Sequence, residues 1–389
     1  MTGNRTRILA FVDNYLPGYK FGGPGKALAN TVDNLGDELD FWVVTSDRDL
    51  GDTEPYPDVP KQSWHPVGKA RAYYVERAKA TLGRLRRLIR QVQPDVIYLN
   101  SFLSRAFTIK PLLLRRLHLI SDARVVVAPR GELSPGALAL RARLKRVFIA
   151  AAKAARLYDG VTWQALSPKD ESEIRGHFGD RAGVMIARNI ISFGSEGQAS
   201  QPQREKVPGE LRVVFLSRIS KLKNLPGALE IMKGVDCPVE FNIYGPKADS
   251  WSECEALINT MRPNVRVNYM GGVGHDRVQS VLNDHDLFFL PTFSEGAATA
   301  VIEALVVGCP VLISTNTPYR DLEREQAGWD IPLDQPEAFR AALRRCAEMD
   351  ASVHQQWRRG ARNYGLKFAD TKAVLEEHRR LLGRPKIAD

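Results

Sequence analysis

The sequence predicts an α/β protein with two doubly wound domains, each built on a parallel sheet. Its 389 residues are enough for two hydrophobic cores. Short apolar segments alternate with helical segments along both halves of the chain. A polar stretch at residues 191–209, rich in Gly, Ser, Gln and Pro, separates the two runs and is typical of a linker. We expect the two sheets to face each other across a cleft, because such sheets bind ligands at the carboxyl ends of their strands.

Each element follows from an apolar run or a helical period. The strands expected in the first half are Ile8–Val12, Phe41–Thr45, Asp95–Leu99, Val125–Ala128 and Val161–Leu166, and the helical stretches are Pro24–Leu35, Val75–Gln93, Leu103–Leu117 and Ala139–Leu157. The strands expected in the second half are Leu211–Leu216, Val239–Tyr244, Val265–Tyr269, Leu287–Leu290 and Val311–Ile313, followed by closing helices at Val353–Tyr364 and Thr371–Leu382. We therefore predict domains at residues 1–190 and 210–365, with residues 366–389 forming a helix that packs back towards the first domain.

Composition and charge limit the function classes. The chain is 44% hydrophobic and 26% charged, it has no apolar run long enough to span a membrane, and its four cysteines lack metal-binding spacing. From the polar start of the sequence we expect no signal peptide. We expect a cytoplasmic protein without a zinc site. Residues 1–190 carry 30 Lys and Arg against 19 Asp and Glu, whereas residues 191–389 are nearly neutral. This asymmetry indicates an anionic partner of the first half, such as a membrane surface, a lipid phosphate or nucleic acid.

Two carboxylates flank a turn that joins a buried strand to a helix. Glu295 lies in the loop after the strand, and Glu303 lies in the helix that ends at Gly308. The small residues between them, Gly296, Ala297, Ala298 and Thr299, let backbone N–H groups approach an anion at the helix N-terminus. A phosphate on these N–H groups and sugar hydroxyls on the carboxylates describe a nucleotide-sugar site. The alternative is a solvated loop Glu and a helix Glu stabilised by the macrodipole.

Two further loops follow strands at the edge where ligands bind. After Leu211–Leu216, the segment from Arg218 to Lys223 presents cations suited to a diphosphate, although such residues also occur as solvated surface charges. After Ile8–Val12, Gly22 and Gly23 precede a helix and permit close backbone approach, although an ordinary strand–helix turn has the same pattern. The loop with Gly22 and Gly23 lacks the dinucleotide-binding fingerprint.

These motifs together resemble the retaining family 4 glycosyltransferases, which have the GT-B fold of two Rossmann-like domains. The resemblance rests on Pro17 to Gly23, on Arg218 to Lys223, and on Glu295 and Glu303 followed by Gly308 to Val311. The segment from Ala128 to Gly136 is similar to a subgroup that builds bacterial polysaccharides and lipid-linked glycans. Asn189 falls where the family often has Pro-Asn-Gly.

The resemblance implies transfer of a hexose-type sugar from a UDP- or GDP-sugar to a glycan or lipid-linked acceptor, with retention at the anomeric carbon. Arg218 and Lys223 would then stabilise the leaving diphosphate and Glu295 would contact the donor sugar. Donor binding would also use Glu303, on the ribose, and the backbone of Gly22, Gly23, Gly296, Ala297, Ala298 and Thr299. We expect no metal and no other cofactor, because the cations can neutralise the diphosphate.

The acceptor is expected on the first domain. Arg130 and Glu132 follow a strand there, where Glu132 would orient an acceptor hydroxyl or form an ion pair with Arg130. Many family members have a His after the strand that ends at Leu99, but this chain has Asn100 there, a third acceptor-side candidate. The family's Gly-Phe-Gly after the first Glu is Gly-Ala-Ala in this chain, so the donor's identity does not transfer.

The basic first half suits a peripheral protein on the inner face of the cytoplasmic membrane. An apolar stripe that includes Leu85, Ile89 and Val92 is flanked by Arg84, Arg87 and other cations. Either this stripe packs on the sheet and the cations are solvated, or the cations dock to anionic lipid. Two other functions remain open at this point: a nucleotide-sugar epimerase of similar architecture and a basic nucleic-acid-binding protein. The chain lacks a recognised nucleic-acid-binding motif, so we expect no nucleic acid partner.

Overall fold

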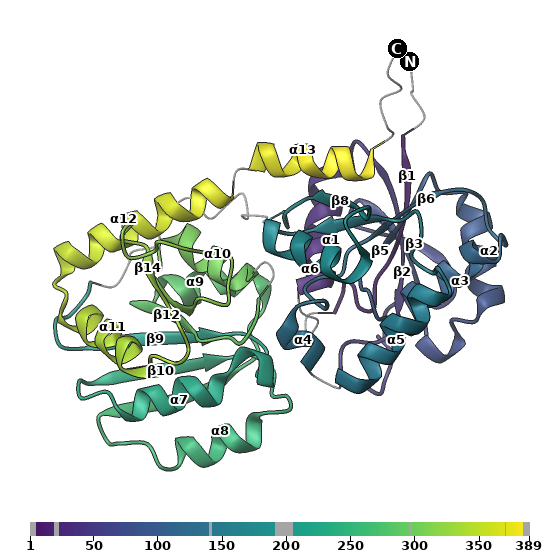
Figure 1. Cartoon of the computed structure of the whole chain (residues 1–389). Helices are drawn as coiled ribbons and strands as arrows, with labels where there is room; N and C mark the ends of the chain where they lie inside the picture. The colour runs from purple at the N-terminus through teal and green to yellow at the C-terminus, as the bar shows by residue number, and fades with distance from the viewer. Residues whose placement is uncertain are drawn as a thin grey trace. The chain divides into compact units, whose positions relative to one another are not determined.

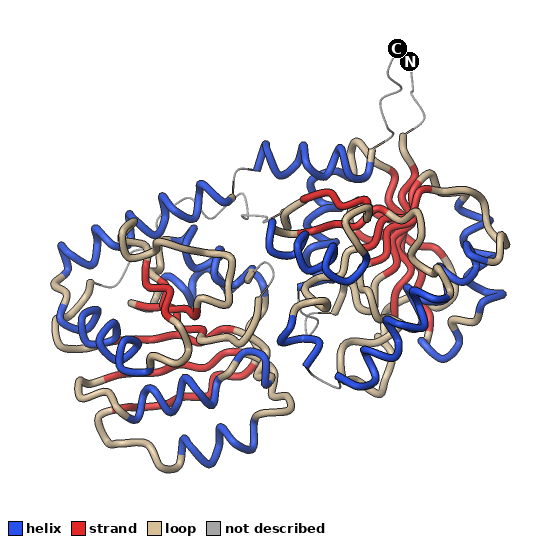
Figure 2. The backbone as a smooth tube through the Cα atoms, in the orientation of Figure 1, coloured by secondary structure: helices blue, strands red, loops and turns tan. Residues whose placement is uncertain are grey.

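The computed structural model describes residues 5–18, 23–139, 142–190, 205–295, 298–369 and 371–383. The chain divides into two compact units. Unit 1 contains Met1–Ser192 together with Thr371–Asp389, and unit 2 contains Phe193–Asp370. Each unit has one β-sheet with helices on both of its faces (Figures 1 and 2). The predicted α/β class with two doubly wound sheets is therefore confirmed.

The sheet of unit 1 has the strand order β3-β4-β2-β1-β5-β6-β7-β8. Its strands are β1 (Arg7–Phe11), β2 (Asp40–Ser46), β3 (Trp64–Val67), β4 (Ala70–Val75), β5 (Val96–Leu99), β6 (Arg124–Val127), β7 (Thr162–Ala165) and β8 (Gly183–Ile186). All neighbours pair in parallel except β3, which pairs antiparallel with β4. The sequence did not predict β3, β4 or β8, and the expected parallel sheet has one antiparallel pair, β3 with β4, at one edge.

The helices of unit 1 cover both faces of that sheet. They are α1 (Gly23–Leu35), η1 (Arg77–Lys79), α2 (Leu82–Val92), η2 (Arg105–Ile109), α3 (Lys110–Arg116), α4 (Pro135–Ala139), α5 (Ala142–Ala154), α6 (Pro168–Phe178) and α13 (Thr371–Leu382). Alternate residues of β1 point to opposite faces. Leu9 therefore belongs to a core with Leu85 of α2, whereas Ile8 belongs to a core with Leu28 of α1 and Leu381 of α13.

The predicted helix Val75–Gln93 is wrong in its first part. Val75 ends strand β4, and α2 begins only at Leu82. The Thr81 side chain accepts a hydrogen bond from the Arg84 N–H and caps the helix at that point. The aromatic pair before Val75 favours a strand. The stretch that the helical period alone predicts as one helix is therefore a strand followed by a helix that begins after the Thr81 cap.

The sheet of unit 2 is parallel throughout, with the order β11-β10-β9-β12-β13-β14. Its strands are β9 (Leu211–Leu216), β10 (Val239–Tyr244), β11 (Val265–Gly271), β12 (Leu287–Leu290), β13 (Val311–Ser314) and β14 (Gly328–Ile331). Its helices are η3 (Lys221–Lys223), α7 (Leu225–Lys233), α8 (Trp251–Ile258), α9 (His275–Asn283), α10 (Thr299–Val307), α11 (Pro336–Glu348) and α12 (Ala351–Phe368). Every residue of β12 and β13 is buried, as expected for strands covered on both faces.

The predicted linker at residues 191–209 lies mostly outside the described residues. Its described end, residues 205–209, packs on unit 2: Gly209 N–H donates to the Ala347 carbonyl (2.8 Å), and Lys206 is buried with its ammonium on the same carbonyl (3.2 Å). At the other end of the chain, α12 belongs to unit 2 and α13 to unit 1. Within the described parts of the chain, no helix has the length and apolar character needed to cross a membrane.

Candidate active site

The basic loop of unit 2 follows β9, in the centre of the sheet. Arg218 is exposed, whereas the Lys223 side chain is only 20% exposed. The neighbouring strand approaches this loop closely at Gly245, where φ is +142° and a Cβ atom would lie 1.9 Å from the Ser217 carbonyl oxygen. Only glycine fits at that contact. The backbone of Ile219 is then fixed by a hydrogen bond from its N–H to the Pro246 carbonyl (3.1 Å).

Hydrogen bonds attach the loop after β12 to this basic loop. The Thr292 hydroxyl and the Phe293 N–H both donate to the Leu222 carbonyl, at 2.8 and 2.9 Å. The Asn224 side-chain amide donates to the Pro291 carbonyl (2.9 Å) and its oxygen accepts from Gly227 N–H, which caps α7. These bonds hold two loops that are distant in the sequence in one fixed arrangement.

As a result, Lys223 and Glu295 form an ion pair, and the Glu295 side chain is only 12% exposed. Burial lowers the pKa of the Lys223 ammonium to about 7, and the positive charge of Arg218 acts in the same direction. Contact with the carboxylate opposes this shift, because it favours the charged form of the lysine. The pKa of Lys223 therefore lies near neutral pH in the free protein, and a bound anion would raise it again.

The turn from β12 into α10 carries the remaining donor-site candidates. Ala298 precedes the helix in the left-handed conformation (φ +41°), and its carbonyl accepts from the N–H groups of Val301 and Ile302. Thr299 begins the helix, and Glu303 is buried in its second turn. Gly296 and Ala297 lie outside the described residues. A left-handed alanine costs about 1 kcal/mol, and it stands where the family resemblance places a glycine.

Glu303 lies near Tyr319, and both side chains are buried. Burial raises the pKa of the Tyr319 hydroxyl, and the Tyr364 hydroxyl and the Glu303 carboxylate act in the same direction. The buried position of Glu303 on a helix gives it a fixed orientation, which suits a residue that binds hydroxyl groups. Glu303 and the Lys223–Glu295 pair all belong to unit 2.

The acceptor-side candidates lie in unit 1 at the carboxyl ends of β5 and β6. Arg130 follows β6 in a left-handed conformation (φ +54°). Its guanidinium donates to the oxygens of the Tyr98 hydroxyl (2.7 Å), the Asn100 amide (2.7 Å) and the Asn189 amide (2.6 Å). Asn100 and Arg130 are therefore brought together.

Glu132 does not join this group, and the alternative of an Arg130–Glu132 ion pair is wrong. Its carboxylate accepts hydrogen bonds from the Ser101 hydroxyl (3.0 Å) and from the N–H groups of Phe102 (2.5 Å) and Leu103 (3.2 Å). Burial raises its pKa, and these hydrogen bonds oppose the rise. Glu132 thus fixes the loop after β5, and its proposed contact with an acceptor hydroxyl stays a prediction.

Gly23 is the first residue of α1, and Gly22 lies outside the described residues. A Cβ atom at Gly23 would meet no described heavy atom within 4 Å. The described packing therefore does not require a glycine there. No group of three or more His, Cys, Asp or Glu side chains that could hold a metal ion occurs among the described residues.

The sequence did not indicate Tyr98 or Gln164 as site residues, and it indicated Asn189 only as a position of the family resemblance. The Tyr98 hydroxyl donates to the Gln164 side-chain oxygen (2.5 Å), which links the Arg130 group to β7. The sequence does indicate where the Tyr98 side chain lies, because residues two apart on a strand share one face. Tyr98 therefore points to the same side as Asn100 and could have been predicted as its neighbour.

Comparison with known proteins identifies the class of unit 2. Residues 198–364 match the family described as "Glycosyl transferases group 1". A comparison with curated protein sequences found no match. The matched segment contains the basic loop, the Lys223–Glu295 pair and Glu303.

Solved structures of similar fold extend over the whole chain. Sucrose-phosphate synthase from Thermosynechococcus elongatus aligns with a TM-score of 0.73 at 16% identity and covers 97% of this chain and 98% of its own. HepE from Anabaena, solved in complex with UDP and glucose, aligns with a TM-score of 0.70 at 15% identity and covers 98% and 100%. WaaG, a glycosyltransferase involved in lipopolysaccharide biosynthesis, aligns with a TM-score of 0.67 at 15% identity and covers 97% and 100%. The chain therefore has the GT-B fold, and residues 198–364, which make up most of unit 2, match the model of glycosyl transferases group 1.

Proposed function

We propose that the protein is a retaining glycosyltransferase that moves a hexose-type sugar from a UDP- or GDP-sugar to a glycan or lipid-linked hydroxyl. One observation carries the proposal. Lys223, with the charge of Arg218 beside it, is paired with Glu295 at the carboxyl ends of β9 and β12, inside the segment that matches the family. Ligands of parallel sheets bind at this edge. The structure of HepE with UDP and glucose supports the choice of donor class.

In the proposed reaction the bond between the anomeric carbon and the β-phosphate oxygen breaks, and the acceptor oxygen forms a new bond on the same face of the sugar. The electron pair of the broken bond leaves with the diphosphate, and the departing phosphate oxygen takes up the proton that the acceptor hydroxyl loses. Arg218 and Lys223 would stabilise that developing negative charge, because cations already in place need no reorganisation as the charge forms. The proposal includes metal independence, since these two cations can supply the neutralising charge.

The carboxylates would hold the other parts of the donor. Glu303, fixed within α10, would accept hydrogen bonds from the ribose hydroxyls. Glu295 would contact the transferred sugar and would give up its ion pair with Lys223 when the diphosphate arrives. The N–H groups at the start of α10 would add hydrogen bonds to the phosphates, because a helix N-terminus favours an anion.

We further propose that the protein works at the cytoplasmic face of a bacterial membrane, in the synthesis of a cell-surface polysaccharide. The surface of α5 supports this better than α2, because the described part of the predicted α2 stripe is largely packed in the core. On α5 the apolar Leu144 and Val147 are 59% and 68% exposed, with exposed Arg143 and Arg146 between and beside them. Each cation near an anionic membrane contributes about 1 kcal/mol of attraction.

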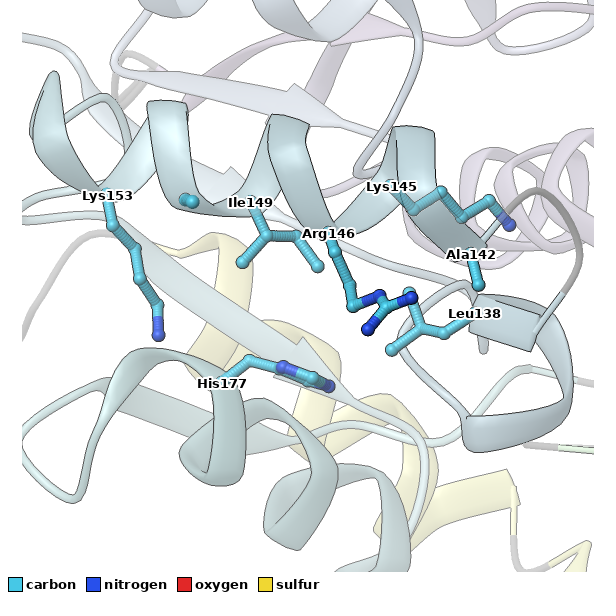
Figure 3. Close-up of a pocket in the computed structure, with 8 residues that line it drawn as sticks. Leu138, Ala142, Lys145, Arg146, Ile149, Lys153 and His177 are labelled. Atoms are coloured by element: carbon cyan, nitrogen blue, oxygen red, sulfur yellow. The ribbon is translucent and has the colours of Figure 1, made fainter.

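A pocket of about 230 Å³ lies beside this surface, between α5 and α6 (Figure 3). Its apolar wall includes Leu138 and Ile149, and its basic side chains are Lys145, Arg146, Lys153 and His177. Apolar walls with cations at the rim suit an anionic amphiphile. This feature favours a lipid-linked acceptor, whose chain would remain at the membrane while its sugar reaches the sheet edge.

The test is ligand-induced thermal stabilisation with UDP-, GDP- and ADP-sugars. We expect one nucleotide class to raise the melting temperature of the wild type and of Lys221→Ala, which removes an exposed cation of the same loop. Arg218→Ala and Lys223→Ala should lose the response. If both variants keep the full response and normal transfer, the assigned donor site is wrong. Product analysis separates transfer from epimerisation, because an epimerase needs no acceptor.

A further inference from the structure

The guanidinium of Arg130 is surrounded by uncharged oxygen atoms. Its three hydrogen-bond partners are the Tyr98 hydroxyl and the side-chain amides of Asn100 and Asn189. Among the described residues, no carboxylate lies within ion-pair distance of it. A partly buried arginine normally has a carboxylate partner, because removing a charge from water without a counter-ion is costly.

The same group has more hydrogen-bond donors than acceptors. Arginine only donates, so both amides must turn their oxygens towards it and their NH2 groups away. Asn100 is 2% exposed, and its buried NH2 has no partner among the described residues. The Arg130 Nε–H is also buried without a partner. The group therefore combines one positive charge with several unused N–H donors.

Three carboxylates of the same unit have other hydrogen-bond partners. Glu132 accepts from the loop after β5, as described above, and Asp13 pairs with Arg77 (3.6 Å) and accepts from the Ser104 hydroxyl (3.0 Å). Asp170 lies within electrostatic range of Arg130, but its carboxylate accepts from the Leu166 N–H (3.1 Å), and burial raises its pKa. The described protein therefore supplies no direct counter-ion for Arg130.

The residues of the group follow the carboxyl ends of three parallel strands of one sheet. Asn100 follows β5, Arg130 lies just beyond β6, and Asn189 lies just beyond β8. Figure 1 labels these three strands, β5, β6 and β8, in the sheet of unit 1. Ligands of doubly wound sheets bind at such an edge. The unused donors thus lie where a ligand is expected.

We propose that Arg130, Asn100 and Asn189 bind an oxyanion, and that this oxyanion belongs to the acceptor. The acceptor would therefore carry a carboxylate or a phosphate close to the hydroxyl that receives the sugar, rather than being a neutral glycan. The link to the acceptor rests on the proposed function, whereas the anion site itself does not. A uronic acid and a sugar or lipid phosphate offer the same chemistry to these donors.

The test uses the full chain and three probes: inorganic phosphate, glucuronate, and glucose as the neutral control. Melting temperatures are measured at constant ionic strength, with and without saturating UDP to occupy the basic loop of unit 2. We expect phosphate, glucuronate or both to stabilise the wild type, with no effect of glucose. Arg130→Gln should weaken the apparent affinity for the effective anion about tenfold or more, because a charge-assisted hydrogen-bond pair is lost. Arg87→Gln, which removes an exposed charge from α2 of the same unit, should respond like the wild type.

A second variant, Asn100→Asp, keeps the test decisive if Arg130→Gln does not fold. This isosteric change places a carboxylate at the position of an amide oxygen that accepts from Arg130 at 2.7 Å. It therefore supplies the missing counter-ion. We expect a higher melting temperature without any ligand, together with loss of the anion response.

The outcomes distinguish a phosphate from a carboxylate as the bound anion. They also distinguish failure of the anion site from failure of the proposed function. A response to phosphate alone identifies a phosphorylated acceptor, and a response to glucuronate alone identifies a uronic acid. The inference is overturned if Arg130→Gln and Asn100→Asp retain the wild-type anion response, or if glucose stabilises as well as the anions do. Failure of UDP to bind would count against the proposed function only, because the responses of unit 1 are read without UDP as well.

Discussion

The two units each place a cation at the carboxyl ends of parallel strands, but they neutralise it differently. In unit 2, Lys223 has its own counter-ion in Glu295. In unit 1, the hydrogen bonds that Arg130 donates to described residues all end on uncharged oxygens. A cation with an internal partner keeps its loop ordered without ligand and exchanges partners when the ligand arrives. A cation without one leaves its charge for the ligand to neutralise. The difference suits a shared donor diphosphate in one unit and an acceptor-specific anion in the other.

The largest effect is expected from Lys223→Ala. The leaving diphosphate loses one preorganised cation, which usually costs about 3–4 kcal/mol of barrier, or 10²–10³-fold in rate. The measurement is the transfer rate with the nucleotide sugar that stabilises the protein most. Lys221→Ala is the matched control and should retain the wild-type rate. Equal rates for both variants would remove Lys223 from the mechanism.

A second prediction concerns the stability of unit 1. Glu132→Ala removes the carboxylate oxygen that accepts from the N–H groups of both Phe102 and Leu103, so these two N–H groups lose this partner. We expect a loss of about 1–3 kcal/mol in the free energy of unfolding, measured by urea denaturation. Anion binding at Arg130 should persist in the folded variant, because Glu132 is not part of that group. A variant of wild-type stability would contradict the structural role of this carboxylate.

A third prediction concerns a variant in which the cation of unit 2, like Arg130 in unit 1, has no carboxylate partner. Glu295→Gln removes the counter-ion, so the diphosphate no longer competes with a carboxylate for Lys223. We expect UDP itself to bind about tenfold more tightly, while sugar transfer slows because the contact to the donor sugar changes. Calorimetric titration of UDP measures the affinity. Weaker UDP binding would mean that the ion pair assists the donor rather than competing with it.

The pH dependence of donor binding gives a fourth prediction. Lys223 has its pKa lowered to about 7 in the free protein. A diphosphate binds the protonated lysine, so above this pH binding requires the uptake of one proton. UDP affinity should therefore fall by up to about tenfold per pH unit from pH 7 upwards. The dependence should be weaker in Lys223→Arg, which stays charged; an identical pH profile in both proteins would exclude this lysine as its source.

The sequence was sufficient for features that depend on local pattern. Apolar runs located the strands of unit 2 that carry the site, and the spacing of Glu295 and Glu303 located the turn into α10. It failed where two local signals compete, as at Thr81, where a cap interrupts an apparent helical period. It also failed where partners are chosen in three dimensions. The pairing of Lys223 with Glu295 depends on the bonds from Thr292 and Phe293 to Leu222, and no spacing encodes them.

The central claim is that Lys223 binds the donor and Arg130 binds the acceptor. Its most direct test is calorimetric titration of UDP or GDP into the wild type, Lys223→Ala and Arg130→Gln. The account predicts that Lys223→Ala loses nucleotide binding, whereas Arg130→Gln binds the nucleotide like the wild type, because its anion belongs to the acceptor. Retained binding in Lys223→Ala, or a loss in Arg130→Gln as large as that in Lys223→Ala, would contradict the assignment of the donor to unit 2.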